Sequence, residues 1–215
     1  MKGITRSATV AAIAVLLTSI SLVGSIAGAA TSDGSAQAAT PGSGDATYRI
    51  PPDQLSELFQ HYSVSKISPP GPAPDFTLDD LSGSPQTLSD LKGDFVFLNF
   101  WNSECPPCRD EMPDMDTLWN ATKNHRFTML AVNVREPRAK VKKWIEHKDR
   151  NYTFPVLLDI TGKVARMYGI QYFPTTYFIN PQGDVVGGLV GPRAWNTTEL
   201  VQFIRSLPDR SGETG

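Results

Sequence analysis

The chain has 215 residues, of which 40% are hydrophobic, and a formal net charge of -2 at pH 7. This length suits one domain with extensions, and the composition is sufficient for a sizeable core. The small net charge excludes a general electrostatic attraction to nucleic acid or acidic membranes, so no nucleic-acid partner is expected. Only two cysteines are present, which excludes a framework of structural disulfides.

Residues 1–30 have the features of an export leader. Lys2 and Arg6 precede an uncharged stretch that continues to residue 32, and Ala27-Gly28-Ala29 matches the small-residue pattern of a cleavage site. The uncharged stretch is also longer than the roughly 20 residues that span a bilayer. A cleaved signal peptide and an uncleaved signal anchor therefore both remain open. Both predict an extracytoplasmic domain, either secreted or anchored in the membrane.

Residues 31–69 are expected to form a flexible spacer, because small and polar residues dominate the first part of this segment. A short amphipathic helix is predicted within it by apolar residues at helical spacing: Leu55, Leu58, Phe59 and Tyr62. Two roles are open for this helix, which either packs on the following domain or forms a stalk. A proline-rich run over residues 68–74 predicts a stiff, extended connector.

One compact domain is expected over residues 70–209, followed by a disordered tail over residues 210–215. Its predicted elements are strands over 95–101, 127–134 and 155–159, helices over 105–123, 137–148 and 162–169, a hairpin over 175–190 and a last helix from 197. The alternation of strands and helices predicts an α/β fold, with helices on both faces of the sheet. The lysines of the helix over 137–148 are expected on a solvated face. In the helix over 162–169, three residues are expected to face the core: Ala165, Met167 and Tyr168.

The two cysteines lie in Cys105-Pro106-Pro107-Cys108, directly after the predicted strand over residues 95–101. Proline favours the first position of a helix, so a helix is expected to begin at Cys105. At a helix N-terminus, free backbone N–H groups and the helix dipole favour a thiolate, which is the species that attacks disulfides. The pattern predicts a dithiol–disulfide enzyme, in which the exposed Cys105 attacks and the more buried Cys108 resolves the mixed disulfide.

An inert disulfide and half of a metal site are the alternatives for this pair. A disulfide that closes so short a loop adds little stability to a fold. Structural zinc needs four ligands, and the chain has no second cysteine pair to supply them. The histidines, His61, His125 and His147, show no ligand spacing with each other. The redox interpretation is therefore favoured, with no metal and no cofactor.

Local chemistry also indicates the direction of the reaction. Pro106 and Pro107 have no N–H group, so the amide of Cys108 is expected to be the main donor to the Cys105 sulfur. Glu104 adds a negative charge next to that sulfur, which disfavours the thiolate further. Because a poorly stabilised thiolate gives a less oxidising couple, these features predict a reductant.

Several motifs resemble the thioredoxin superfamily, namely Trp101-x-x-x-Cys105-x-x-Cys108, Pro113 and Phe173-Pro174-Thr175. More narrowly, residues 73–78, 97–101 and 108–113 resemble its exported TlpA/ResA/CcmG-like branch. The resemblance implies a thioredoxin-like fold with a central mixed β-sheet. It also implies a cis peptide bond between Phe173 and Pro174, where the backbone pairs with a substrate strand. The substrate-contacting residues expected on this basis are Trp101, Pro106, Pro107, Phe173, Pro174 and Thr175.

Two positions depart from the thioredoxin pattern. Asn99 stands where thioredoxin has a buried aspartate, and Glu104 stands where it has a tryptophan. The resemblance to the ResA-like branch implies that Glu111, three residues after Cys108, belongs to the active site and replaces the missing base. The alternative is a solvent-facing carboxylate, because Asp110 is its acidic neighbour on the same helix.

The expected function is therefore an exported thiol-disulfide oxidoreductase that reduces protein disulfides. The family resemblance implies a disulfide-containing exported substrate, for example a cytochrome c apoprotein, and electrons from a membrane thiol donor. A disulfide oxidase or isomerase is the alternative in the same class. A thioredoxin-fold copper chaperone is the alternative in another class, although such proteins use a wider Cys-x-x-x-Cys spacing with a distant histidine. A peroxiredoxin-type peroxidase would have Thr or Ser where this chain has Asn102.

Overall fold

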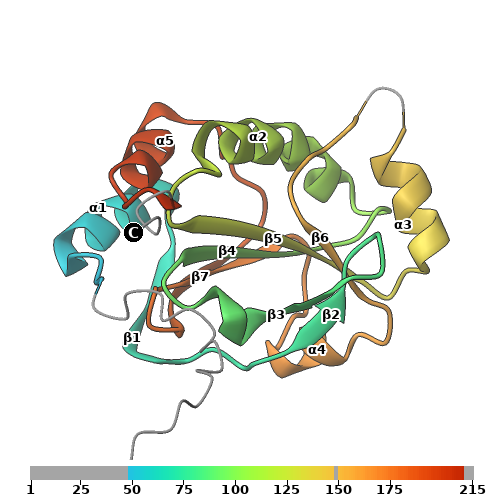
Figure 1. Cartoon of the computed structure of the whole chain (residues 1–215), viewed down its shortest axis with the longest axis horizontal. Helices are drawn as coiled ribbons and strands as arrows, with labels where there is room; N and C mark the ends of the chain where they lie inside the picture. The colour runs from blue at the N-terminus through green and yellow to red at the C-terminus, as the bar shows by residue number, and fades with distance from the viewer. Residues whose placement is uncertain (1–47, 148–149, 211–215) are drawn as a thin grey trace, which may run out of the picture. The chain divides into compact units, whose positions relative to one another are not determined.

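The computed structural model describes residues 48–147 and 150–210 (Figure 1). Its elements, in chain order, are α1 (Pro52–Tyr62), β1 (Ser65–Pro72), β2 (Thr77–Asp79), β3 (Pro85–Thr87), the 3-10 helix η1 (Leu88–Leu91), β4 (Phe95–Trp101), α2 (Pro106–Thr122), β5 (Phe127–Val134), α3 (Arg138–Ile145), β6 (Val156–Asp159), α4 (Lys163–Met167), β7 (Thr175–Ile179), β8 (Asp184–Val190) and α5 (Thr198–Arg205). The predicted leader (residues 1–30), the first part of the spacer and most of the tail lie outside the described residues. Within the described ranges, no helix is long and apolar enough to cross a membrane.

The main sheet has six strands in the order β1-β8-β7-β4-β5-β6. Strands β4, β5 and β6 run parallel, whereas β7, β8 and β1 join as successive antiparallel neighbours. The sheet is therefore mixed, and the predicted thioredoxin-like α/β architecture is confirmed. Both connections between the parallel strands pass through a helix, α2 and then α3, as parallel neighbours require.

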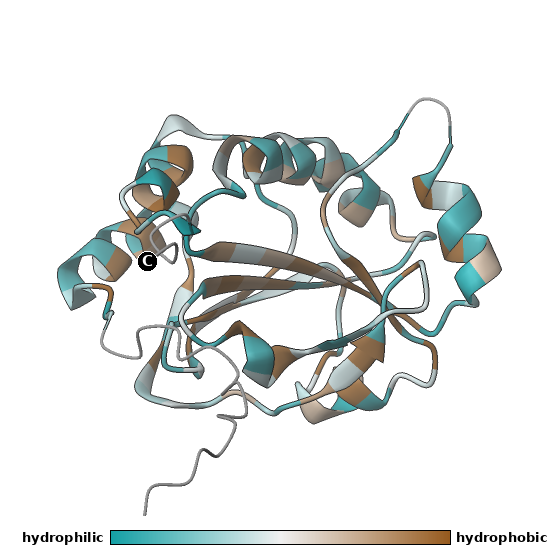
Figure 2. Ribbon diagram, in the orientation of Figure 1, coloured by the Kyte–Doolittle hydropathy of each residue, from teal (hydrophilic) through white to brown (hydrophobic). Residues whose placement is uncertain are grey.

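Helices cover both faces of this sheet, with α1, α2 and α5 on one face and α4 with the β2–β3 hairpin on the other (Figure 1). Strand β4 is buried along its whole length, because its side chains alternate between these two layers. Phe95, Phe97 and Trp101 pack on the α2 side, whereas Val96, Leu98 and Phe100 pack on the α4 side. Figure 2 shows this hydrophobic centre, with polar residues on the outer surfaces of the helices.

The N-terminal part of the described chain is packed into the domain, although the sequence predicted a spacer up to residue 69. The predicted amphipathic helix exists as α1, and its apolar face is buried against the main core rather than exposed on a stalk. The proline-rich segment forms strand β1, which pairs with β8 at the sheet edge. Proline is tolerated there because an edge strand needs N–H donors on one side only. The Ser68–Pro69 bond is cis.

The short helix α4 corrects one predicted orientation. Ala165 and Tyr168 are buried as expected, but Met167 is 42% exposed. Five helical residues make fewer than two turns, so the helix has room for only a narrow buried stripe.

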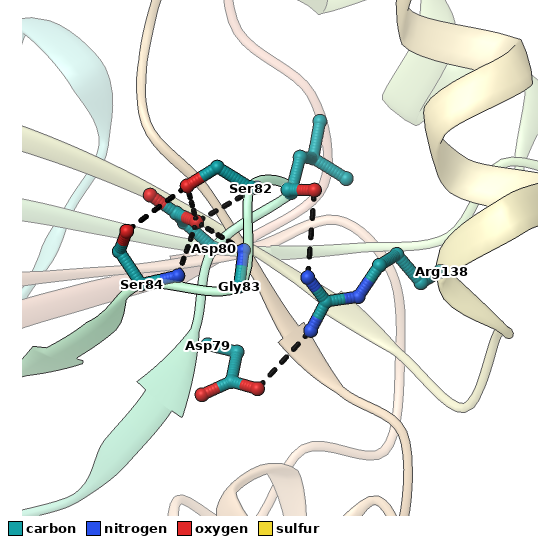
Figure 3. A network of polar contacts seen from close by, with 7 residues as sticks. Asp79, Asp80, Ser82, Gly83, Ser84 and Arg138 are labelled. Atoms are coloured by element: carbon teal, nitrogen blue, oxygen red, sulfur yellow. Dashed lines mark hydrogen bonds and ion pairs between the residues drawn. The ribbon is translucent and has the colours of Figure 1, made fainter.

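The β2–β3 hairpin is fixed by its own turn and by α3 (Figure 3). Asp80 Oδ1 accepts hydrogen bonds from the backbone N–H groups of Ser82, Gly83 and Ser84, at 2.8, 2.9 and 2.9 Å. Its hydrogen bonds with Ser82 are the main cause that lowers the pKa of Asp80. Arg138, at the start of α3, forms an ion pair with Asp79 at 3.1 Å. These contacts join the hairpin to the helix that follows β5.

Helix α1 approaches the sheet closely at Gly187 in β8. A Cβ atom at this position would lie 2.7 Å from the Phe59 ring and 2.8 Å from Val64. We expect Gly187→Ala to lower the free energy of unfolding by about 1–3 kcal/mol, because the added methyl group forces α1 away from the sheet. Urea unfolding of the purified protein measures this.

Gly71 in β1 provides the matched control, since a Cβ there would meet nothing within 4 Å. Gly71→Ala should change the free energy of unfolding by less than about 0.5 kcal/mol. Equal effects of the two substitutions would show that the packing of α1 does not require a residue without a side chain at position 187 of β8.

Candidate active site

The turn that carries the cysteines lies at one edge of the sheet, next to the Phe173–Pro174 bond. Strand β4 ends at Trp101, and its residue Phe100 pairs with Thr175 at the start of the antiparallel strand β7. The end of β4 and the start of β7 therefore meet at the same sheet edge. Functional groups of α/β proteins often gather at such an edge, where parallel strands end.

Cys105 and Cys108 lie at disulfide-bonding distance, with 2.16 Å between their sulfur atoms and 5.3 Å between their Cα atoms. Cys105 is the N-cap of α2, and its sulfur accepts a hydrogen bond from the amide of Cys108 at 3.3 Å. The predicted helix start and the predicted donor are both confirmed. Cys105 is partly exposed and Cys108 is fully buried, so a partner molecule can reach only the first sulfur.

A buried carboxylate that the sequence analysis missed fixes the turn before Cys105. Glu136 accepts hydrogen bonds from the backbone N–H and the hydroxyl group of Ser103, both at 2.7 Å, and from Asn133 Nδ2 at 2.7 Å. Burial by itself would raise the pKa of Glu136, but hydrogen bonds from Asn133, Lys140 and Ser103 outweigh it and hold the pKa below its ordinary value. Glu136 is therefore ionised at neutral pH and anchors the turn.

Lys140 connects this carboxylate to Glu104, the residue that precedes Cys105. Its Nζ atom lies 2.7 Å from Glu136 Oε1 and 2.5 Å from Glu104 Oε1. Lys140 is exposed, as predicted for the solvated face of this helix, but its ion pair with Glu104 opposes a charge whose effect on the Cys105 sulfur was expected to be unopposed. The i,i+4 spacing of Glu136, just before α3, and Lys140, in its first turn, was the available signal. Because Lys140 offsets the Glu104 charge, Glu104 disfavours a thiolate less than expected.

Glu111 is buried, with 3% of its surface exposed. Its Oε1 atom accepts a hydrogen bond from Asn99 Nδ2 at 2.9 Å, and its Oε2 atom accepts from Trp195 Nε1 at 2.9 Å and from the Arg193 amide at 3.3 Å. Burial raises the pKa of Glu111 to about 7, although the hydrogen bonds act in the opposite direction. The solvent-facing alternative is therefore wrong, whereas the neighbouring Asp110 is exposed.

The environment of Glu111 combines distant parts of the chain. The i,i+3 spacing places Glu111 on the face of α2 that also carries Cys108. Asn99 in β4 donates to Glu111 and also to Thr176 Oγ1 in β7, at 3.1 Å. Asn99 was recognisable in the sequence as the residue that replaces a buried aspartate. Trp195 was not recognisable, because no local pattern predicts a contact across 84 residues.

The Phe173–Pro174 bond is cis, as the resemblance implied. The Pro174 carbonyl accepts a hydrogen bond from the Gly191 amide at 2.8 Å, and the Thr175 hydroxyl donates to the Tyr172 carbonyl at 2.7 Å. Pro174 and Thr175 are buried, whereas Phe173 is partly exposed. Tyr172 is 66% exposed beside them.

The remaining expected substrate contacts differ in exposure. Pro106 is exposed and Pro107 is partly exposed, so both are accessible next to Cys105. Trp101 is fully buried and packs against Trp144, with 5.3 Å between the ring centroids. Trp101 therefore has no surface for a substrate, because the side chain at the end of β4 points into the core under α3. In the part of the chain that the structure describes, no three His, Cys, Asp or Glu side chains form a group that could hold a metal ion.

The profile of the AhpC/TSA family matches residues 70–187. The thiol-disulfide oxidoreductase ResA of Geobacillus kaustophilus is 43% identical over 113 residues, which are 53% of this chain and 64% of that protein. The chain thus spans just under two thirds of this relative. The thiol-disulfide oxidoreductase ResA of Geobacillus thermodenitrificans is 42% identical over 135 residues, which are 63% of this chain and 75% of that protein.

Solved structures of other proteins share the architecture of this chain. The thiol:disulfide interchange protein DsbE from Chlorobium tepidum is similar to this chain with a TM-score of 0.57 and 32% sequence identity. The match covers 66% of this chain and 97% of that structure. The cysteine pair at the start of α2 lies inside the matched family region. The chain therefore belongs to the AhpC/TSA family of thioredoxin-like proteins, and it is a thiol-disulfide oxidoreductase.

Proposed function

We propose that this chain is an exported reductase of protein disulfides, in which Cys105 attacks the substrate and Cys108 resolves the mixed disulfide. The observation that carries the proposal is the unequal burial of Cys105 and Cys108 at the start of α2. An incoming disulfide can reach Cys105, whereas Cys108 can react only with a sulfur already bound at Cys105. This order of accessibility matches the two steps of thiol–disulfide exchange.

The reaction starts from the reduced protein. The Cys105 thiolate attacks one sulfur of the substrate disulfide, and the other substrate sulfur leaves as a thiolate that takes up a proton. Cys108 then loses its proton and attacks the Cys105 sulfur, which re-forms the Cys105–Cys108 disulfide and releases the substrate as a dithiol. Two electrons pass to the substrate, and a membrane thiol donor returns two electrons to the disulfide.

Glu111 is proposed as the group that accepts the Cys108 proton. It is buried, it shares a helix face with Cys108, and its pKa is raised to about 7 by burial. A general base works best when its pKa is close to the working pH. Asn99 holds the carboxyl group in place, which supports a role for Asn99 in orienting the base.

The reductase direction rests on the N-terminus of α2. The Cys105 sulfur accepts one backbone hydrogen bond, because Pro106 and Pro107 supply no N–H group. A thiolate with few donors is weakly stabilised, and this makes the couple less oxidising. The Glu104 charge contributes little to this direction, since Lys140 pairs with it.

The proposed substrate class and cellular location are inferred from the resemblance to the TlpA/ResA/CcmG-like branch. Disulfides of exported proteins, for example of apocytochrome c, are the proposed substrates, and they would contact Pro106 and Phe173 beside the reactive sulfur. The leader-like residues 1–30 support export of the domain, with the leader either cleaved or retained as a membrane tether. The site residues Pro107, Pro174 and Thr175 are proposed to shape the surface on which the substrate strand lies.

The reduction potential of the Cys105–Cys108 couple tests the direction. We expect a value near or below that of thioredoxin, about -270 mV, because the thiolate is weakly stabilised. Equilibration of the purified protein with glutathione buffers, followed by alkylation, measures the potential. A value near that of DsbA, about -120 mV, would replace the reductase with an oxidase.

Cys108→Ala should trap substrates as mixed disulfides at Cys105, because the resolving sulfur is missing. The full chain is expressed in a cell that exports it, and the adducts are separated on non-reducing gels and identified. Cys105→Ala is the matched control, since it leaves only the buried Cys108 sulfur and should trap far fewer partners. Equal trapping by the two variants would contradict the assigned order of attack.

Glu111→Gln should slow the second step by about 100-fold at pH 8, the size of a typical general-base contribution. In the wild-type protein the carboxylate fraction grows as the pH rises through about 7, so the rate of resolution should rise over the same range. The variant should lose this rise. Stopped-flow mixing of reduced protein with a disulfide peptide measures both rates, and Asp110→Asn controls for loss of an exposed charge on α2. An unchanged pH profile would remove Glu111 from the reaction.

A further inference from the structure

The second oxygen of Glu111 is held by a segment that no motif predicted. Trp195 donates its indole N–H to Glu111 Oε2 at 2.9 Å, and the amide of Arg193 donates to the same oxygen at 3.3 Å. Trp195 is fully buried, so water cannot take the place of this donor. The indole also meets Phe97 of β4 edge to face, with 4.7 Å between the ring centroids. The position of Trp195 is thus determined by close packing.

The last residue of α1 contacts both donor residues of this segment. The Tyr62 ring stacks on Trp195, with 5.5 Å between the centroids and 21° between the planes. The Tyr62 carbonyl accepts a hydrogen bond from Arg193 Nε at 3.0 Å. The Tyr62 hydroxyl is hydrogen-bonded to Thr197, the N-cap of α5. Tyr62 therefore fixes the segment over residues 193–197 at three points.

We propose that Trp195 is a positioning residue for Glu111, and that Tyr62 at the end of α1 holds Trp195 where its indole N–H meets the carboxyl group. The proposal rests on the proposed role of Glu111 as the base for Cys108. It makes α1 part of the redox site, although α1 lies more than forty residues before Cys105. The indole favours the charged form of Glu111 over the neutral form, because the N–H group is a donor.

The groups around Glu111 determine how its contact with the Trp195 indole can be measured. The residues that contact Glu111 are Asn99 from β4 and Arg193 and Trp195 from the C-terminal segment, with Tyr62 from α1 one layer further. Cys108 lies three residues before Glu111 on α2, on the same helix face. In the oxidised protein Cys108 does not titrate, and burial raises the pKa of Tyr62 above its ordinary value of 10.0. Glu111 is then the group in direct contact with the indole that changes charge near neutral pH. His61 also contacts the Tyr62 ring, with 4.9 Å between the centroids.

Nuclear magnetic resonance of the oxidised protein tests the contact without any substrate. The chain has four tryptophans, and the indole N–H signal of Trp195 is assigned with Trp195→Phe. We expect this signal to shift with pH, with a midpoint near 7, and to lose the shift in Glu111→Gln. His61→Gln controls for the imidazole that contacts the Tyr62 ring, and the shift should survive it. A Trp195 signal that is independent of pH, or that follows His61, would overturn the proposal.

The pH profile of the reaction, in which the rate of resolution is measured against pH, tests the consequence of the contact. Trp195→Phe keeps an aromatic ring and removes the donor, so the pKa of Glu111 should rise by about one unit. The rate of resolution should then reach its half-maximum at a pH about one unit higher than in the wild type. Trp119→Phe is the matched control, because Trp119 packs on Phe127 away from Glu111 and should leave the profile unchanged. In a Glu111→Gln background, Trp195→Phe should have no further effect on the profile.

The contribution of α1 is tested at Tyr62. Tyr62→Leu removes the stacking partner of Trp195 and should move the profile in the same direction as Trp195→Phe. Tyr62→Phe retains the ring and should move it less. If Tyr62→Leu leaves both the Trp195 signal and the profile unchanged, α1 has no part in positioning the indole.

The outcomes separate this proposal from the proposed function. If the protein reduces disulfides but Trp195→Phe leaves the pH dependence of resolution unchanged, the positioning role is overturned. The reductase function is then unaffected. A protein whose Trp195 signal titrates with Glu111, but which reduces no disulfide, overturns the reductase and leaves the contact itself established.

Discussion

The burial of the Glu111 carboxyl group is the constraint on which the rest of the site depends. A carboxyl group deep in a core is tolerated only with hydrogen-bond partners, because unpaired burial costs several kcal/mol. The partners of Glu111 come from β4 and from the segment before α5, so α2, the sheet and that segment must dock in one arrangement. The contacts that organise the core are thus the same ones that hold a titratable group on the helix face that carries Cys108.

Glu136 shows how a second buried carboxyl group takes the opposite role. Hydrogen bonds and the nearby ammonium group of Lys140 hold its pKa below the ordinary value, whereas burial raises the pKa of Glu111 to about 7. Glu136 therefore stays charged and fixes the turn before Cys105. Glu111 can exchange a proton near neutral pH. The environments of the two buried acids shift their pKa values in opposite directions, and this gives them different roles. Glu136 holds the site in place, and Glu111 moves a proton.

The elements of the fold were predictable where the physics is local. Long apolar runs indicated β4 and β5, and proline at the start of α2 indicated the N-cap at Cys105. The inward orientation predicted for Met167 was wrong, because a helix of fewer than two turns buries little surface. The amphipathic helix predicted within the spacer exists as α1 and packs on β8, whereas the strand β1, which pairs with β8, was not predicted. Composition alone could not show that this sheet edge offered a place for them.

The sequence by itself determined the chemistry of the redox pair: the two sulfurs, their spacing, and the single amide that reaches the first of them, since all three depend on four consecutive residues. Only the tertiary structure decided the state of the surrounding carboxyl groups. Glu111 is buried and Asp110 is exposed on the same helix, because β4 and Trp195 close over one face only. Desolvation depends on which distant segments pack together, and no short stretch of sequence specifies that.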